Sequence, residues 1–94
     1  MLEARRRTGD ELELWGAATL ADAHVLHAAL LDTMDVPGTV TLDLFGLEDL
    51  DFAGMQILAA FVRSRGRERV AFTGCPEALQ QRIRLAGLES WIPA

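Results

Sequence analysis

Carboxylates are the chemically capable side chains that lie closest together in this sequence. Glu48, Asp49 and Asp51 fall within one short segment, which follows an alternating run and precedes a run with helical spacing. Oxygen ligands of this kind can bind a hard cation such as Ca²⁺ or Mg²⁺. The positive end of a helix dipole also favours acidic side chains at this place. We interpret the three carboxylates as structural and expect no metal site.

The other reactive side chains lack the partners that catalysis requires. His24 and His27 lie one helical turn apart, but no cysteine or carboxylate accompanies them with metal-ligand spacing. Cys75 precedes a predicted helix, where a thiolate would be stabilised, yet no dyad with either histidine is indicated. Ser64 and Ser90 do not lie on a glycine-flanked strand-to-helix turn. The sequence therefore predicts neither a nucleophilic triad nor a metal centre.

Composition excludes further classes of function. The chain has no lysine, which excludes a Walker-type phosphate loop and a lysine Schiff base. Its net charge is −5, and a phosphate backbone binds poorly to an acidic surface. We expect no enzyme, no cofactor and no nucleic-acid partner. The cluster of Arg63, Arg65, Arg67 and Arg69 is interpreted as a solvated helix end, because cations complement the negative end of the helix dipole.

Length and hydropathy indicate one small cytoplasmic domain over residues 1–94. No apolar run approaches the length of a membrane span, and the first residues lack the apolar region of a signal peptide. We expect no direct membrane insertion. The single cysteine, Cys75, fits a reducing compartment.

The first part of the chain predicts a hairpin and a helix. Strands over 2–7 and 11–15 flank a Thr-Gly-Asp turn, with Gly16 ending the second strand. In this register Arg7 faces Glu11 and Arg5 faces Glu13. A capping-box-like segment then opens a helix over 20–34, whose core-facing stripe is predicted to be Leu20, Ala23, His27, Leu30, Leu31 and Met34.

The rest of the chain predicts two strand-helix units. A strand with alternating apolar residues starts near Val40 and leads through the acidic segment 48–51, taken as a loop, into a helix over 53–64. That helix has a polar face of only Gln56, Ala60 and Arg63, so it is either buried on two sides or carries a partner surface. A strand over 69–73, a helix after Pro76 and a short extended tail over 90–93 complete the chain.

The order β-β-α-β-α-β-α predicts an α/β fold with a four-stranded mixed sheet. The one-sided apolar stripes of the first and third helices place the helices mainly on one face of that sheet. Loops at strand-to-helix junctions carry much of the binding chemistry of α/β domains. We therefore expect the functional site at the junction around residue 51.

Two segments resemble the core motif of STAS domains, a family that includes bacterial anti-sigma-factor antagonists and a subunit of an ABC-type phospholipid transporter. They are positions 42–47 (LDLFGL) and 51–58 (DFAGMQIL). The family pattern is an aliphatic strand followed by Asp-Ser-Ser-Gly or a close variant at the start of a helix. Segments 14–16, 19–23, 72–76, 85–88 and 91–93 match in order, so the resemblance covers nearly the whole chain.

The resemblance implies a protein-binding module without enzymatic activity. In the antagonists the second residue after the motif aspartate is a serine phosphorylated by a partner kinase. Here that position is Ala53, and the preceding position is Phe52, so both hydroxyls are absent. The resemblance therefore implies a regulatory variant that is not switched by phosphorylation at this loop. Gln56 is similar to a pattern found in signalling or scaffold STAS proteins.

The partner is left open by the sequence. It is either an anti-sigma or kinase-like regulator, a signalling assembly, or the ATPase of an ABC-type phospholipid transport complex, with a weak homodimer as a further possibility. An anion or nucleotide site at the same junction is disfavoured by its carboxylates. The expected partner-binding residues are Asp51, Phe52, Ala53, Gly54, Gln56 and Ala60.

Overall fold

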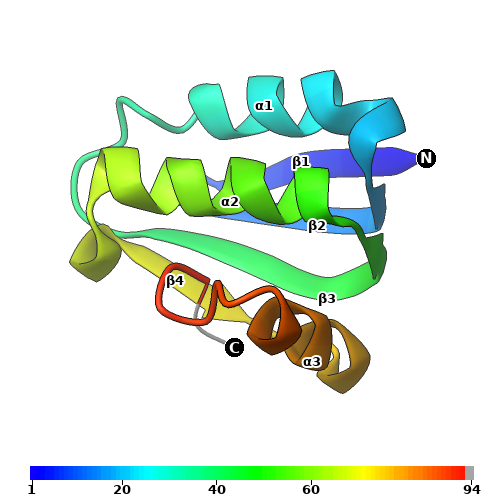
Figure 1. Ribbon diagram of the computed structural model, residues 1–94. Coiled ribbons are helices and arrows are strands. Elements are labelled where there is room, and N and C mark those ends of the chain that lie inside the picture. Colours follow the sequence, from blue (N-terminus) through cyan, green and yellow to red (C-terminus); the bar gives the residue numbers. More distant parts are fainter. Residues whose placement is uncertain (93–94) are drawn as a thin grey trace.

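The computed structural model describes residues 1–92 and has the element order expected from the sequence (Figure 1). The four strands are β1 (Leu2–Thr8), β2 (Glu11–Ala18), β3 (Val40–Leu50) and β4 (Val70–Thr73). The helices are α1 (Ala23–Leu31), α2 (Phe52–Arg65) and α3 (Glu77–Leu85), with short 3₁₀ helices η1 (Leu20–Asp22) and η2 (Arg67–Arg69).

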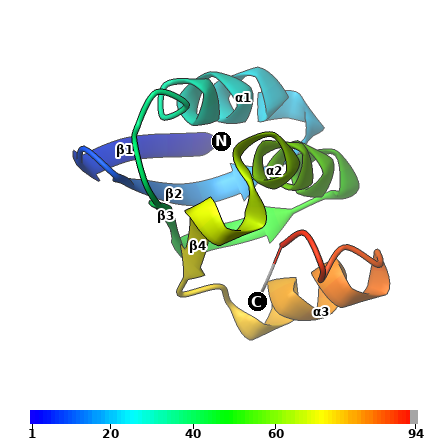
Figure 2. The same cartoon turned by 90° about the vertical axis from the view of Figure 1, so that its left-hand side faces the viewer.

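The strands form one mixed sheet in the order β1-β2-β3-β4. The β1–β2 pair is antiparallel, whereas β2–β3 and β3–β4 are parallel. Figure 2, turned by 90° from Figure 1, shows α1, α2 and α3 on the same side of the sheet. The predicted fold class is therefore confirmed. The opposite face carries charged residues of β1 to β3, including the ion pair of Arg5 with Glu13 at 3.0 Å.

The hairpin register follows the sequence pattern with one shift. Arg5 pairs with Glu13 as predicted, but a register shift between Arg6 and Thr8 places Thr8 opposite Glu11. Arg7 nevertheless reaches Glu11 at 3.3 Å, because an arginine side chain is long enough to span the shift. Salt bridges to Glu13 and Asp43 then join β1, β2 and β3 on the exposed face.

The two central strands are longer than the sequence indicated. β2 continues past Gly16, which adopts φ +93°, to Ala18. It supplies a pairing partner for the end of β3, where Ala17 pairs with Asp49 and Ala18 with Leu50. The acidic segment predicted to be a loop is therefore the last part of β3, because sheet pairing satisfies its backbone groups. Only Asp51 separates that strand from α2.

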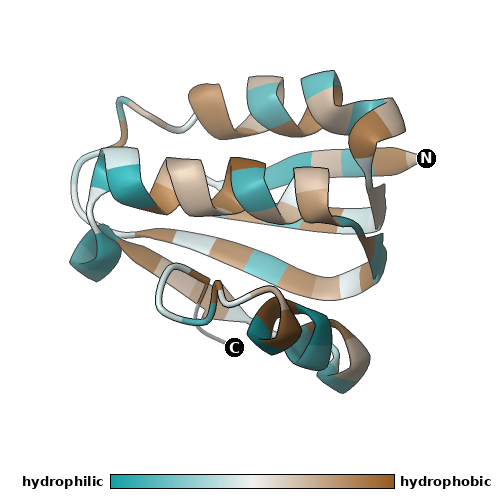
Figure 3. Cartoon of the chain, viewed as in Figure 1, coloured by the Kyte–Doolittle hydropathy of each residue, from teal (hydrophilic) through white to brown (hydrophobic). Residues whose placement is uncertain are grey.

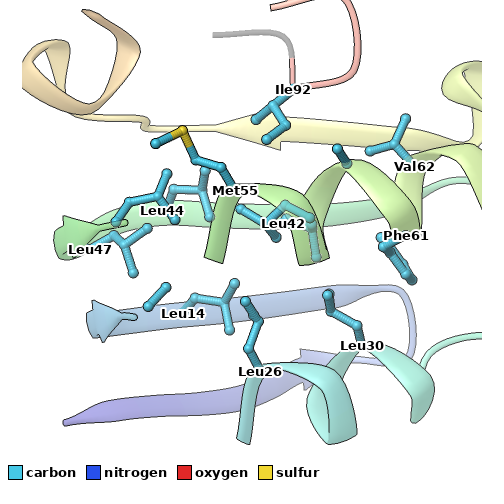
Figure 4. Close-up of a cluster of buried hydrophobic side chains, with 14 of the residues drawn as sticks. Leu14, Leu26, Leu30, Leu42, Leu44, Leu47, Met55, Phe61, Val62 and Ile92 are labelled. Atoms are coloured by element: carbon cyan, nitrogen blue, oxygen red, sulfur yellow. The ribbon is translucent and has the colours of Figure 1, made fainter. Parts of the chain in front are cut away.

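The core lies between the sheet and the helices as one cluster of buried apolar side chains (Figure 4). Leu12 and Leu14 of β2 and Leu42 and Leu44 of β3 point toward the helices, as their alternation predicted. On α2 the side chains that pack into this core include Met55, Leu58, Ala59 and Val62.

The predicted stripe of the first helix is wrong except for Leu30. Leu26 and Leu30 are the buried residues of α1, whereas Leu20 and Leu31 are 72% and 56% exposed and His27 also faces solvent. Apolar residues occupy two neighbouring rows of this helix, so spacing alone does not say which row is inward. The packing against β1 and α2 selects the row of Leu26, and the other apolar row stays on the surface.

Arg65 is buried, contrary to the interpretation of its cluster as solvated. Its side chain is 6% exposed, and its guanidinium donates to backbone carbonyls across the α1–β3 loop. These are the carbonyl oxygens of Thr33 at 3.2 Å, Met34 at 3.4 Å, Gly38 at 2.7 Å and Val36. Nε donates to the Arg69 carbonyl at 3.1 Å. Five N–H donors in a fixed plane suit such a set of acceptors.

The end of the described chain turns instead of extending. The backbone N–H groups of Trp91 and Ile92 both donate to the Leu88 carbonyl, at 2.9 and 2.8 Å. Ile92 is fully buried and Trp91 is half-buried, so both pin the tail to the body as expected. Pro93, also placed in this tail by the sequence, lies outside the described residues.

Candidate functional site

Asp51 holds the strand-to-helix junction in place with its carboxylate. It is the N-cap of α2, where Oδ1 accepts a hydrogen bond from the Gly54 backbone N–H at 2.9 Å. Oδ2 accepts from the Leu20 backbone N–H at 2.9 Å, in the segment that follows β2. One side chain thus satisfies a free donor of the helix start and ties two separate chain segments together.

Gly54 lets α2 approach the end of β2 closely. A Cβ atom at this position would lie 2.2 Å from the Ala18 carbonyl oxygen, so no other residue fits without a backbone shift. Gly54 is buried for this reason. Of the six expected binding residues it therefore belongs to the scaffold, and it presents no side chain to a partner.

The remaining expected residues form one exposed edge of α2. Phe52 is 55% exposed, and Gln56 and Ala60 are also exposed, whereas Ala53 is half-buried. Ala53, Gln56 and Ala60 line a hollow of about 470 Å³. Leu20, which stands between β2 and α1, lines the same hollow. Hence the junction residues and the exposed start of the α1 segment share one surface.

The acidic residues before the junction have structural partners. The Asp49 carboxylate pairs with Arg82 of α3 and also accepts the Leu50 backbone N–H at 2.8 Å. These hydrogen bonds, the one from Arg82 first, hold the pKa of Asp49 below its usual value. Glu48 is exposed beside it. The ion pair links the end of β3 to α3 and does not resemble an acid–base pair.

The other chemically capable residues stay apart. His24 and His27 are exposed on α1, and within residues 1–92 no group of three metal-ligating side chains comes together. Burial raises the pKa of the Cys75 thiol above its usual value, which disfavours the reactive thiolate. The Cys75 carbonyl accepts a hydrogen bond from the Gln80 side chain at 2.9 Å. The burial of the Cys75 thiol and the hydrogen bond to its carbonyl therefore fit a structural role for this residue.

Sequence reasoning missed a second hollow next to the first. It has a volume of about 160 Å³ and lies between α1 and α2, with His27, Leu31 and Met34 on one wall and Ile57 and Phe61 on the other. The sequence pattern placed Leu31 and Met34, which are exposed in this hollow, in the core. The signal that could have found it is the number of apolar residues on α1, which exceeds what one buried stripe of a short helix needs.

Comparison with known proteins assigns the family. A family model described as "Mlab, STAS domain" matches residues 1–93. The chain is a STAS domain. The resemblance stated from the sequence is thereby confirmed. A comparison with curated protein sequences finds no match.

The structure of this STAS domain is similar to the crystal structure of an anti-sigma factor antagonist from Mycobacterium paratuberculosis. The TM-score is 0.76 at 26% sequence identity, and the match covers 99% of this chain and 82% of that one.

The geometry of the STAS domain explains the two ends of its motif. Asp51 caps α2 and binds the backbone of Leu20, and Gly54 allows the helix to touch Ala18, so both are required by the fold. Between them, Phe52 is a large exposed aromatic residue, and Ala53 is a small, half-buried residue without a hydroxyl group. No helix within residues 1–92 has the length and apolar character needed to cross a bilayer.

Proposed function

We propose that this STAS domain is a non-enzymatic regulatory module of the bacterial cytoplasm that docks a protein partner through the start of α2. The similarity to an anti-sigma factor antagonist supports a regulatory role in protein interaction. The docking surface consists of Asp51, Phe52, Ala53, Gln56 and Ala60. The partner is an anti-sigma or kinase-like regulator or a signalling assembly.

The observation that carries the proposal is the exposure of Phe52. A large aromatic residue stands 55% exposed at the first position of a helix whose start is fixed by two hydrogen bonds of Asp51. Aromatic side chains in fixed positions often dominate binding energy at protein interfaces. A rigid support lowers the entropy that is lost when such a side chain is buried by a partner.

Binding at this surface is constitutive with respect to phosphorylation, because neither Phe52 nor Ala53 has a hydroxyl group. A phosphate at this place would add about −1.5 to −2 charges beside the carboxylates of β3 and the junction. Ala53→Asp imitates part of this effect. It should weaken partner binding while the domain stays folded, since a carboxylate in the first turn of a helix is tolerated.

The absence of that hydroxyl also favours a second candidate function. A STAS subunit bound permanently to the ATPase of an ABC-type phospholipid transport complex needs no phosphorylation switch. In this role the same surface of α2 stabilises a complex and does not release its partner.

Affinity purification of the native complex tests both functions. A histidine-kinase-like protein among the bound partners supports the first, and an ABC-type ATPase supports the second.

Phe52→Ala should weaken binding by on the order of 2 kcal/mol, about 30-fold in Kd, because a hot-spot anchor is lost. Its melting temperature should stay within a few degrees of the unaltered chain. Leu85→Ala, an exposed residue at the end of α3, is the matched control and should bind normally. A destabilised Phe52→Ala chain that binds fully would contradict the proposal.

A further inference from the structure

Two hollows adjoin each other beside α2, and together we call them the α1–α2 groove. Both are lined by Ile57 and Ala60, so the hollow at the junction meets the one between α1 and α2 at this part of the helix. Figure 3 shows apolar colours over much of both helices, interrupted by a few polar turns. From Ala53 to Ser64 the groove follows α2 over about 16 Å, at roughly 1.5 Å per residue.

The deep end of this groove has the size of one large apolar side chain. Its volume is about 160 Å³, and its walls are made mostly by apolar residues that include Leu31, Met34 and Phe61. A closed apolar cavity of about 150 Å³ accepts a benzene ring, and this hollow, although open on one side, offers a similar volume. The hollow therefore suits a phenylalanine or leucine side chain from a partner. The small side chains of Ala53 and Ala60 leave room along the rest of the groove, so that a partner backbone can approach α2.

Charge restricts what can lie along the groove. Among its described lining residues Arg63 alone carries a formal charge. The Arg63 guanidinium lies 5.5 Å from the centre of the Trp91 ring, and that of Arg67 lies 5.9 Å from it. Within residues 1–92 no carboxylate comes within 4.0 Å of either guanidinium. Arg63, which lines the groove, is thus placed against Trp91 and is available to an acidic group.

We infer that the α1–α2 groove binds an amphipathic helix of the partner, with a large apolar side chain in the deep hollow and an acidic side chain against Arg63. A helix presents apolar anchors at positions i, i+4 and i+7, which matches a groove of this length. The inference rests on the proposed docking function and gives the partner surface its chemistry. A second copy of this chain fits less well, because two grooves in twofold contact would each bring Arg63 to an interface without carboxylates.

A peptide library displayed on phage tests the groove. The probe is a set of 14-residue helical peptides with large apolar residues fixed at i, i+4 and i+7 and all other positions randomised. Selection on the full chain should enrich peptides with Asp or Glu on one side of the apolar row. Binding of an enriched peptide should fall at least tenfold for Leu31→Asp. The matched control is Leu85→Asp, since both leucines are exposed last residues of nine-residue helices. This control should leave binding unchanged.

Charge reversal gives an independent measurement. Arg63→Glu should change the preferred residue in the enriched peptides from acidic to basic, whereas Arg84→Glu on α3 should not. Enriched peptides that bind Leu31→Asp as well as the unaltered chain would overturn the inference, as would indifference to the charge at position 63. Self-association that Leu31→Asp abolishes, with no peptide enriched, would assign the groove to a second copy and also overturn it.

The native complex separates this inference from the proposed function. If Leu31→Asp retains the native partner while Phe52→Ala loses it, the junction is the docking site and the groove is not. If both variants retain the partner, the proposed function itself fails.

Discussion

At the scale of single residues, the STAS motif of this chain divides into structural and variable positions. Asp51 makes two hydrogen bonds to the backbone, and Gly54 allows one close approach of α2 to the sheet. Between them, Phe52 is exposed and Ala53 is half-buried, and neither makes a comparable contact. A partner surface can therefore change its chemistry at Phe52 with the least cost to the fold.

Gly54→Ala should destabilise the domain even though alanine favours helices. The added Cβ would lie 2.2 Å from the Ala18 carbonyl oxygen, which belongs to the sheet and moves little. Overpacking of this kind costs about 1–3 kcal/mol, more than the roughly 1 kcal/mol that alanine gains over glycine in a helix. Urea unfolding measures the difference. Gly9→Ala is the control, because a Cβ there meets nothing within 4 Å. Equal stability of the two variants would refute the close-approach argument.

At the scale of elements, a single side chain organises the connection between α1 and β3. Arg65 extends from the last turn of α2 and donates to several carbonyls of the loop that joins α1 to β3. Burial lowers the pKa of its guanidinium from the usual value, and the carbonyl oxygens replace the water that would otherwise solvate its charge. The end of α2 is thereby joined to the loop that follows α1.

Arg65→Met should reduce stability by about 3 kcal/mol, because hydrogen bonds from a charged donor are lost and the half-buried carbonyls of Val36 and Gly38 lose this donor. Amide hydrogen exchange should also become faster in the segment 32–39. Arg69→Met, at an exposed position in η2, should change stability by less than about 0.5 kcal/mol. If the two substitutions had equal effects, the guanidinium would not be what holds this loop.

At the scale of the whole molecule, the two faces of the sheet have different roles. The helix-covered face holds the core and the candidate docking surface (Figure 2). The other face is crossed by ion pairs such as Arg5 with Glu13, which keep β1, β2 and β3 in register in water. A further ion pair, between Asp49 and Arg82, joins α3 to the end of β3 beside the junction.

The Asp49–Arg82 pair should give the domain a measurable acid sensitivity. Because the folded-state pKa of Asp49 is depressed, its contribution to stability is present above the unfolded pKa of about 3.9 and is lost as pH falls through the folded value. Thermal unfolding at a series of pH values from 7 to 2 measures this loss. Asp49→Asn should be less stable at neutral pH and should show a shallower decline toward low pH. An unaltered slope in the variant would contradict the assignment.

The sequence by itself determined the order of the elements, the fold class and the place of the junction. Alternation in β2 and β3 and the dominant stripe of α2 are local patterns, so they could be interpreted without knowing the neighbours. The ends of elements were harder, because the last part of β3 is a strand only where β2 continues beside it. The family motif located the candidate site, but it did not distinguish the buried Gly54 from its exposed neighbours.

Tertiary packing decided the rest, for reasons that no local pattern contains. Two apolar rows of α1 were equivalent in the sequence, and contact with β1 and α2 placed Leu26 inside and Leu31 outside. In the sequence, Arg65 did not differ from the other three arginines of its cluster. Only the structure shows that carbonyl groups of the α1–β3 loop surround its guanidinium. The groove beside α2 likewise depends on packing, because Leu31 and Met34 line it only when Leu26 and Leu30 are the residues of α1 that turn inward.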